Sequence, residues 1–132
     1  MNLDRSGRVK ADTLEFFATK PGWHSPSDLR VDPVLGAIYP RFPDNKSIQM
    51  RLMRYSRLGI LKRRRAGRKY FYSITQAGKK RLVYFWEKLG YLDQANATTE
   101  KERNLFDARL EVAISIVSEI NMDVRIRLIT ES

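Results

Sequence analysis

The chain has 132 residues and a formal net charge of +10. This length suits one domain with an appendage, and the charge indicates a partner of opposite sign, such as nucleic acid, an acidic membrane surface or an acidic protein. Cysteine is absent, which excludes disulfides and thiolate metal sites, and the single histidine, His24, leaves little for a zinc or haem site, so we expect no metal and no cofactor.

Two helices are predicted in the first third of the chain, after an N-terminal tail of residues 1–7. Residues 9–20 carry apolar side chains at helical spacing, and the dipeptide "PG" ends this segment. A second helix begins at "SPSD", where Ser25 is a favourable N-cap and Asp28 follows three residues later. Its end is open, and a proline-rich connection is expected from Asp32 to Pro43.

A third helix is predicted from residue 46 to about Leu58, with Asp44 or Asn45 as its cap and Gly59 as its end. Its core face is formed by Ile48, Leu52, Tyr55 and Leu58, which follow one another at steps of four, three and three residues. The outward face then carries Lys46, Gln49, Met50, Met53, Arg54 and Arg57. The two methionines are expected either in a groove of the partner or against a neighbouring element.

After Gly59 the apolar period changes from that of a helix to two residues. The segments "ILKRRR" and "KYFYSI" predict a β-hairpin with its turn at Ala66-Gly67, in which Tyr70, Tyr72 and Ile74 share one face. Thr75 can cap a fourth helix over residues 76–92. The apolar stripe of that helix is formed by Leu82, Phe85, Trp86 and Leu89.

The C-terminal part begins with a polar linker, residues 93–99, and continues as a helical extension over residues 100–132. An apolar stripe in the extension is formed by Phe106, Leu110, Ala113, Val117 and Ile120. Such a stripe is too apolar to stand alone in water, so it either folds back onto its own domain or pairs with a second copy. Residues 124–130 alternate like a strand but are also compatible with more helix.

Charge is distributed unevenly along the chain. From Asn45 to Trp86 there are thirteen basic residues and no acidic one, whereas the remainder holds twelve basic and fifteen acidic residues. All of the excess positive charge therefore belongs to one segment. A solvated surface is the simple explanation, but a stretch of this length without one carboxylate favours a polyanion as partner.

Three segments of the chain resemble the winged helix-turn-helix domains of MarR-, ArsR- and PadR-like transcriptional regulators. "HSPSDL" resembles the start of their second helix, "LMRYSRLGIL" the end of their recognition helix, and "YSITQAGKK" their step from the last strand into the next helix. The resemblance covers residues 8–92. It implies a mostly α fold with a small β-hairpin (α+β), followed here by a C-terminal helix. The longer connection between the second and third helices departs from the family pattern.

The resemblance implies sequence-specific binding to double-stranded DNA by a homodimeric regulator, in which the C-terminal stripe forms the dimer. A helix fits the major groove, and a basic hairpin, or wing, beside it reaches phosphates or the minor groove. The helix candidates are Lys46, Ser47, Gln49, Met50, Arg51, Met53, Arg54 and Arg57. The wing candidates are Arg65 and Arg68 for the minor groove and Lys62, Arg63, Arg64 and Lys69 for the phosphates.

Other functions fit parts of the same pattern. The domain is also compatible with an assembly module that docks an acidic protein, or with a nonspecific architectural or RNA-binding protein. The aromatic run from Tyr70 to Tyr72 suits either stacking on unpaired bases or packing within the sheet.

Neither an enzyme nor a membrane protein is expected. The sequence contains no glycine-rich phosphate loop and no nucleophile beside a histidine. Its apolar runs are far shorter than the about 20 residues that span a bilayer, and its polar N-terminus lacks a signal-peptide core. We therefore expect a cytoplasmic, nucleoid-associated protein, and the sequence does not define a small-molecule effector.

Overall fold

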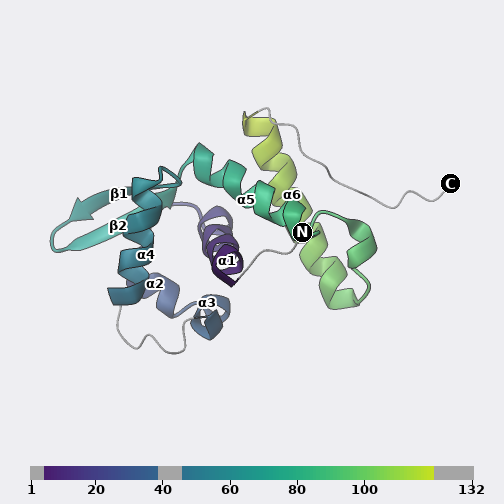
Figure 1. Cartoon of the computed structure of the whole chain (residues 1–132), viewed down its shortest axis with the longest axis horizontal. Helices are drawn as coiled ribbons and strands as arrows, with labels where there is room; N and C mark the ends of the chain where they lie inside the picture. Colours follow the sequence, from purple (N-terminus) through teal and green to yellow (C-terminus); the bar gives the residue numbers. More distant parts are fainter. Residues whose placement is uncertain (1–4, 39–45, 121–132) are drawn as a thin grey trace. The chain divides into compact units, whose positions relative to one another are not determined.

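The computed structural model describes residues 5–38 and 46–120, and Figure 1 shows its elements in chain order. They are α1 (Arg5–Thr19), α2 (Pro26–Arg30), α3 (Pro33–Ile38), α4 (Lys46–Arg57), β1 (Leu61–Ala66), β2 (Lys69–Ile74), α5 (Gln76–Lys88), a 3-10 helix (Gln94–Asn96) and α6 (Glu100–Ile120). The expected mostly α fold with a small β-hairpin and a C-terminal helix is confirmed. Asp44, Asn45 and residues 124–130 lie outside the described residues.

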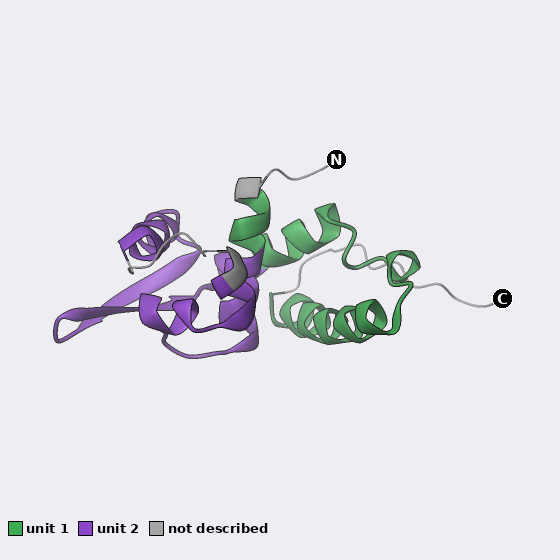
Figure 2. Ribbon diagram, turned by 90° about the horizontal axis from the view of Figure 1, so that it is seen from below, with its two compact units in different colours: residues 1–11, 80–132 green, residues 12–79 purple. Residues whose placement is uncertain are grey.

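The chain divides into two compact units, which Figure 2 colours separately. Unit 2 contains residues 12–79, and unit 1 contains residues 1–11 and 80–132. The buried apolar residues of unit 2 include Leu14, Phe17, Leu29, Leu35, Ile48, Leu52, Tyr55, Ile60, Leu61 and Tyr72. Those of unit 1 include Leu82, Val83, Phe85, Trp86, Leu92, Phe106, Ala113 and Ile116.

The N-terminal helix is longer than the sequence indicated. α1 begins at Arg5, inside the segment 1–7 that was expected as a tail, and ends at Thr19 before the "PG" dipeptide. α2 begins as predicted, with Pro26 in its first turn and the backbone N–H of Ser25 donating to Asp28 Oδ2 at 2.8 Å. This contact is one half of a capping box, so the start of α2 was correctly read from local sequence.

The expected connection from Asp32 to Pro43 contains a further helix, α3, and its description as connection alone was wrong. Asp32 acts as an N-cap, because its Oδ2 accepts hydrogen bonds from the backbone N–H groups of Val34 at 3.2 Å and Leu35 at 3.1 Å. Proline is tolerated in a first helical turn, where its missing N–H has no intrahelical acceptor. Pro33 therefore starts a helix here.

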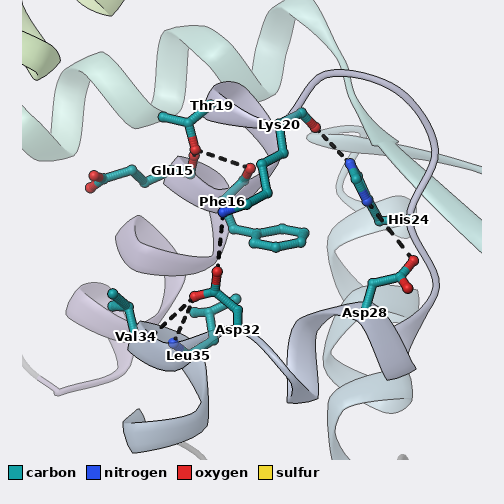
Figure 3. Close-up of polar contacts among 9 residues, drawn as sticks. All are labelled: Glu15, Phe16, Thr19, Lys20, His24, Asp28, Asp32, Val34 and Leu35. Atoms are coloured by element: carbon teal, nitrogen blue, oxygen red, sulfur yellow. Dashed lines mark hydrogen bonds and ion pairs between the residues drawn. The ribbon is translucent and has the colours of Figure 1, made fainter.

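The Asp32 carboxylate also fixes α3 to the end of α1, as Figure 3 shows. Its Oδ1 lies 3.1 Å from Lys20 Nζ in an ion pair. Burial raises the pKa of this carboxyl, but the hydrogen bond from Leu35 and the Lys20 ammonium outweigh burial and hold the pKa below its ordinary value of 3.8. In the same view, His24 Nε2 donates to the Lys20 carbonyl oxygen at 2.6 Å.

α4 presents the predicted apolar face to the core, except at its end. Ile48, Leu52 and Tyr55 are buried, but Leu58 is 60% exposed, so its assignment to the core was wrong. Leu58 still donates its N–H to the Arg54 carbonyl at 3.0 Å, but α4 ends at Arg57 and the chain turns at Gly59, whose φ is +79°, so the Leu58 side chain is left at the surface at the end of the helix.

The hairpin forms with the predicted strands and a turn shifted by one residue. Ala66 pairs with Lys69, so the two-residue loop is Gly67-Arg68 and not Ala66-Gly67. Gly67 has φ = +65°, which two-residue hairpin loops of this kind require and which glycine adopts without strain. A third short segment joins the other edge of β2, where the N–H of His24 donates to the Tyr72 carbonyl at 2.9 Å and that of Tyr72 to the His24 carbonyl at 2.8 Å.

A tight junction joins the end of α4, the base of the hairpin and the start of α5. The Thr75 hydroxyl donates to the Gly59 carbonyl at 2.6 Å and accepts from the Gly78 N–H at 3.0 Å, so it caps α5 as predicted. Gly78 lies directly against Ile60: a Cβ at this position would overlap the Ile60 carbonyl oxygen and come within 2.8 Å of Ile74 Cγ1. Only glycine fits here.

Residues 93–99 are more ordered than a simple linker. The 3-10 helix is capped by Asp93, whose Oδ1 accepts from the Ala95 N–H at 3.0 Å. α6 then starts with a reciprocal capping box, because the Thr99 N–H donates to Glu102 Oε1 and the Glu102 N–H donates to Thr99 Oγ1, both at 3.1 Å. The pKa of the Glu102 carboxyl is held below its ordinary value by the hydrogen bonds that this group accepts, first from the Thr99 hydroxyl, then from the Thr99 backbone N–H and the Thr98 hydroxyl. In the part of the chain that is described, no helix has the length and apolar character needed to cross a bilayer.

The junction at Gly78 generates a stability prediction. Replacing Gly78 with Ala should lower the free energy of unfolding by about 1–3 kcal/mol, since either the hairpin base or α5 must move to admit the methyl group. The control is Gly36→Ala in α3, where a Cβ would meet only the Arg30 carbonyl oxygen, at an ordinary contact distance of 3.5 Å. Because alanine favours a helix more than glycine does, this substitution should raise the free energy of unfolding by about 0.5–1 kcal/mol. Urea unfolding of both variants measures these changes in stability. Equal changes in the two variants would contradict the prediction that Gly78 is required at the junction.

Candidate nucleic-acid interface

The residues predicted on the outward face of the third helix divide into two groups in α4. Lys46, Met50, Arg54 and Arg57 are exposed, whereas Ser47, Gln49, Arg51 and Met53 are half-buried. Arg51 turns toward the core side, with its Nη1 lying 3.5 Å from the Tyr55 hydroxyl. Burial raises the pKa of Tyr55, and the nearby Arg51 guanidinium opposes that rise. The exposed face of α4 is therefore narrower than the sequence indicated.

All six predicted wing residues are exposed on the hairpin; we call Lys62, Arg63, Arg64, Arg65, Arg68 and Lys69 the hairpin cations. Strand register assigns the four on β1 to opposite faces of the ribbon. Arg63 is paired with Tyr72 and Arg65 with Tyr70 on one face, whereas Lys62 is paired with Ser73 and Arg64 with Phe71 on the other. Among the described residues none of the hairpin cations is ion-paired with a carboxylate.

On the first face the arginines stack over Tyr70. The guanidinium carbon of Arg63 lies 4.5 Å from the centre of the Tyr70 ring, and that of Arg65 lies 5.8 Å from it. Arg65 is held further by its Nε, which donates to the Gly67 carbonyl at 3.0 Å. Tyr72, also on this face, is fully buried, so it packs the sheet and offers no surface to a base. Burial raises its pKa, which the neighbouring Arg63 opposes.

On the second face the cations gather over Trp23, a residue that the sequence reasoning did not select. The guanidinium carbon of Arg64 lies 4.7 Å from the centre of the indole, and Lys62 Nζ lies 5.6 Å from it. Trp23 reaches this place because the adjacent His24 pairs with Tyr72 at the edge of β2. The sequence around Trp23 carries no signal for this position, because the pairing of His24 with Tyr72 joins segments far apart in the chain.

A small hollow of about 130 Å³ joins the start of α2, the first turns of α4 and the tip of the hairpin. Its lining residues are Ser25, Pro26, Ser27, Gln49, Arg68, Lys69 and Tyr70. Gln49 therefore borders the hairpin tip rather than the middle of the exposed face of α4. The hollow brings together a polar amide and two cations from segments some twenty residues apart in sequence.

The predicted dimer stripe of α6 is partly occupied within the chain. Phe106 and Ala113 are buried, together with Ile116, whereas Leu110, Val117 and Ile120 are half-buried. Ile114, which was not assigned to the stripe, is 53% exposed. Periodicity identified the apolar side of the helix but not the edge that remains open.

A second, larger hollow of about 460 Å³ lies within unit 1, between the end of α5 and the first turns of α6. Leu105 and Phe106 line it together with Tyr91, over whose ring Arg109 lies at 4.1 Å. The hollow thus combines apolar side chains and one stacked guanidinium with the polar residues Asp93, Asn96 and Glu102.

No protein family, curated protein sequence or solved structure matches this chain. The candidate interface therefore depends on the charges, contacts and exposure of the described residues, and on the motifs quoted above.

Proposed function

We propose that this protein binds double-stranded DNA with sequence preference, as a transcriptional regulator of the winged helix-turn-helix type. α4 enters the major groove, and the hairpin acts as a basic wing on the phosphates or in the minor groove. The observation that carries the proposal is the group of hairpin cations, which are exposed and stacked on aromatic rings in a segment without a carboxylate. Such a surface would oppose folding through self-repulsion unless a polyanion used it.

The cation–aromatic contacts favour phosphate recognition over a merely solvated surface. A guanidinium stacked on a ring keeps its N–H edge free, and its orientation is partly fixed before the partner arrives. Less side-chain entropy is then lost on binding. The protein is proposed to act in the cytoplasm, on the nucleoid, without catalysis of its own.

The proposal is tested by the salt dependence of binding to duplex DNA. We expect the logarithm of the association constant to fall linearly with the logarithm of salt concentration, with a slope that corresponds to about 6–10 neutralised phosphates per dimer. A site selected from a random pool should resist competition by scrambled DNA. A slope near zero removes nucleic acid from the proposal, whereas a steep slope with equal competition by any sequence supports an architectural binder.

Trp23 provides a test that separates orientation from charge. Trp23→Leu leaves the number of cations unchanged but removes the ring under Lys62 and Arg64, so affinity should fall about threefold to tenfold while the salt slope stays the same. Trp23→Phe should retain most of the affinity. The double variant Lys62→Ala/Arg64→Ala should instead lower the slope by about 1–2. If Trp23→Leu changes the slope and not the affinity, the stacking has no role in binding.

We further propose that the protein is a homodimer through the open edge of the α6 stripe. Leu110, Ile114 and Val117 lie within one third of the helix circumference and are exposed or half-buried. If two copies of the chain pair through this edge about a two-fold axis, each copy can bind one half-site of the same operator. Phe106 and Ala113 contribute to the stability of the chain itself and not to the dimer surface, since they are already buried.

Sedimentation equilibrium of the full chain should give the mass of a dimer. Ile114→Asp should weaken dimerisation by at least about tenfold, because the interface would have to bury an unpaired carboxylate. Ser115→Asp is the matched control, as Ser115 is exposed on the next position of the same helix and lies away from the apolar edge. A monomer mass for the unmodified chain, or equal effects of the two substitutions, would contradict the dimer.

A further inference from the structure

The middle of the exposed face of α4 carries an exposed methionine, with the exposed Arg54 one turn on beside it. Met50 is 57% exposed, and Met53, three residues on, lies half-buried beside it. The opposite side of the helix carries the buried residues Ile48, Leu52 and Tyr55. Helical spacing places Lys46 and Arg57 on the same stripe as the methionines, at its two ends.

Neither helix formation nor packing explains a methionine at position 50. Methionine, lysine, glutamine and glutamate have nearly equal helix propensities, so a solvated face of this basic helix gains nothing from a thioether. Burial does not explain it either, because more than half of the side chain is open to solvent. An apolar, flexible side chain between cations is better explained by a partner that is anionic at its margins and apolar at one point.

The length of the stripe suits a helix that lies in the major groove. Lys46 and Arg57 are eleven residues apart, which is about 16 Å along the helix axis, and the groove is about 12 Å wide, enough to admit one helix. With the methionines over the base edges, the long side chains of the two cations can reach phosphates near the two ends of the helix. The only apolar group that base pairs present in the major groove is the C5-methyl group of thymine.

We propose that Met50, with Met53 beside it, contacts thymine methyl groups and determines part of the sequence preference. This inference rests on the proposed function, in which α4 occupies the major groove. Gln49, the other candidate for base recognition in this turn, borders the hollow at the hairpin tip and is less well placed for the centre of the groove. A methionine adapts its unbranched side chain to such a contact without a fixed hydrogen-bond geometry.

The experiment replaces thymine with deoxyuridine, which keeps base pairing and lacks only the methyl group. A preferred duplex is selected from a random pool, and each thymine is replaced singly. We expect one or two positions at which affinity falls about fourfold, the effect of one buried methyl-sized group. Met50→Ala should lose a similar factor on the thymine duplex and become indifferent to deoxyuridine at that position, as expected for two groups that contact each other.

Two variants serve as controls. Met50→Leu keeps apolar volume and should retain discrimination against deoxyuridine. Leu58→Ala removes a similarly exposed apolar side chain that lies beyond the end of α4, and it should leave discrimination unchanged. Met50→Ala is at an exposed helix position and substitutes the best helix former, so folding is preserved, which circular dichroism checks.

The outcomes separate this inference from the proposed function. Steep salt-dependent binding with indifference to every thymine methyl overturns the role of Met50 and leaves DNA binding intact. Absence of salt-dependent binding to any duplex overturns both. Loss of binding to an acidic protein, and not to DNA, on Met50→Ala would make the methionines a protein-docking patch and would also overturn the inference.

Discussion

The contact of Gly78 with the Ile60 carbonyl is the constraint on which the candidate interface depends. It lets the first turn of α5 lie against the base of the hairpin, where Thr75 binds the Gly59 carbonyl and caps α5 in the same place. The end of α4, both strands and the start of α5 therefore meet within a few residues. The hairpin is held at its base by this junction and at the middle of β2 by the two hydrogen bonds between His24 and Tyr72, so these two contacts together set the direction in which its cations project relative to α4.

The hairpin cations are oriented by aromatic rings and are not neutralised by carboxylates among the described residues. A carboxylate beside each hairpin cation would relieve repulsion, but it would also compete with any anionic partner. Trp23 and Tyr70 provide an alternative, because a ring face attracts a cation while leaving its hydrogen-bond donors exposed. Tyr70 supports the cations on one face of the hairpin and Trp23 supports those on the other face. The hairpin can therefore present positive charge on both faces.

Local signals in the sequence were sufficient for most of the helices and strands, and insufficient for the contacts between them. The caps at Ser25 and Thr75 and the core face of α4 follow from spacing, because they depend on residues within one or two turns. α3 was missed because a proline reads as a helix breaker unless the preceding Asp32 is recognised as its cap. Trp23 depends on pairing between segments almost fifty residues apart. The α6 stripe is a further example. Helical periodicity shows which side of the helix is apolar, but it does not show which residues of that side are buried within the chain itself.

The exposed face of α4 and the hairpin differ in the kind of information that they can carry. Charge on the hairpin can strengthen binding to any duplex, because phosphates are the same in every sequence. Discrimination therefore has to come from side chains over the base edges, and most of the cations on α4 sit at the ends of its exposed stripe or at its border. The centre is occupied by Met50 and Met53, with Arg54 exposed beside Met50. If α4 occupies a major groove as we propose, its methionines gain little from a groove without methyl groups and must desolvate polar base edges there. On that proposal α4 would prefer thymine-containing steps, and the hairpin would supply affinity that does not depend on sequence.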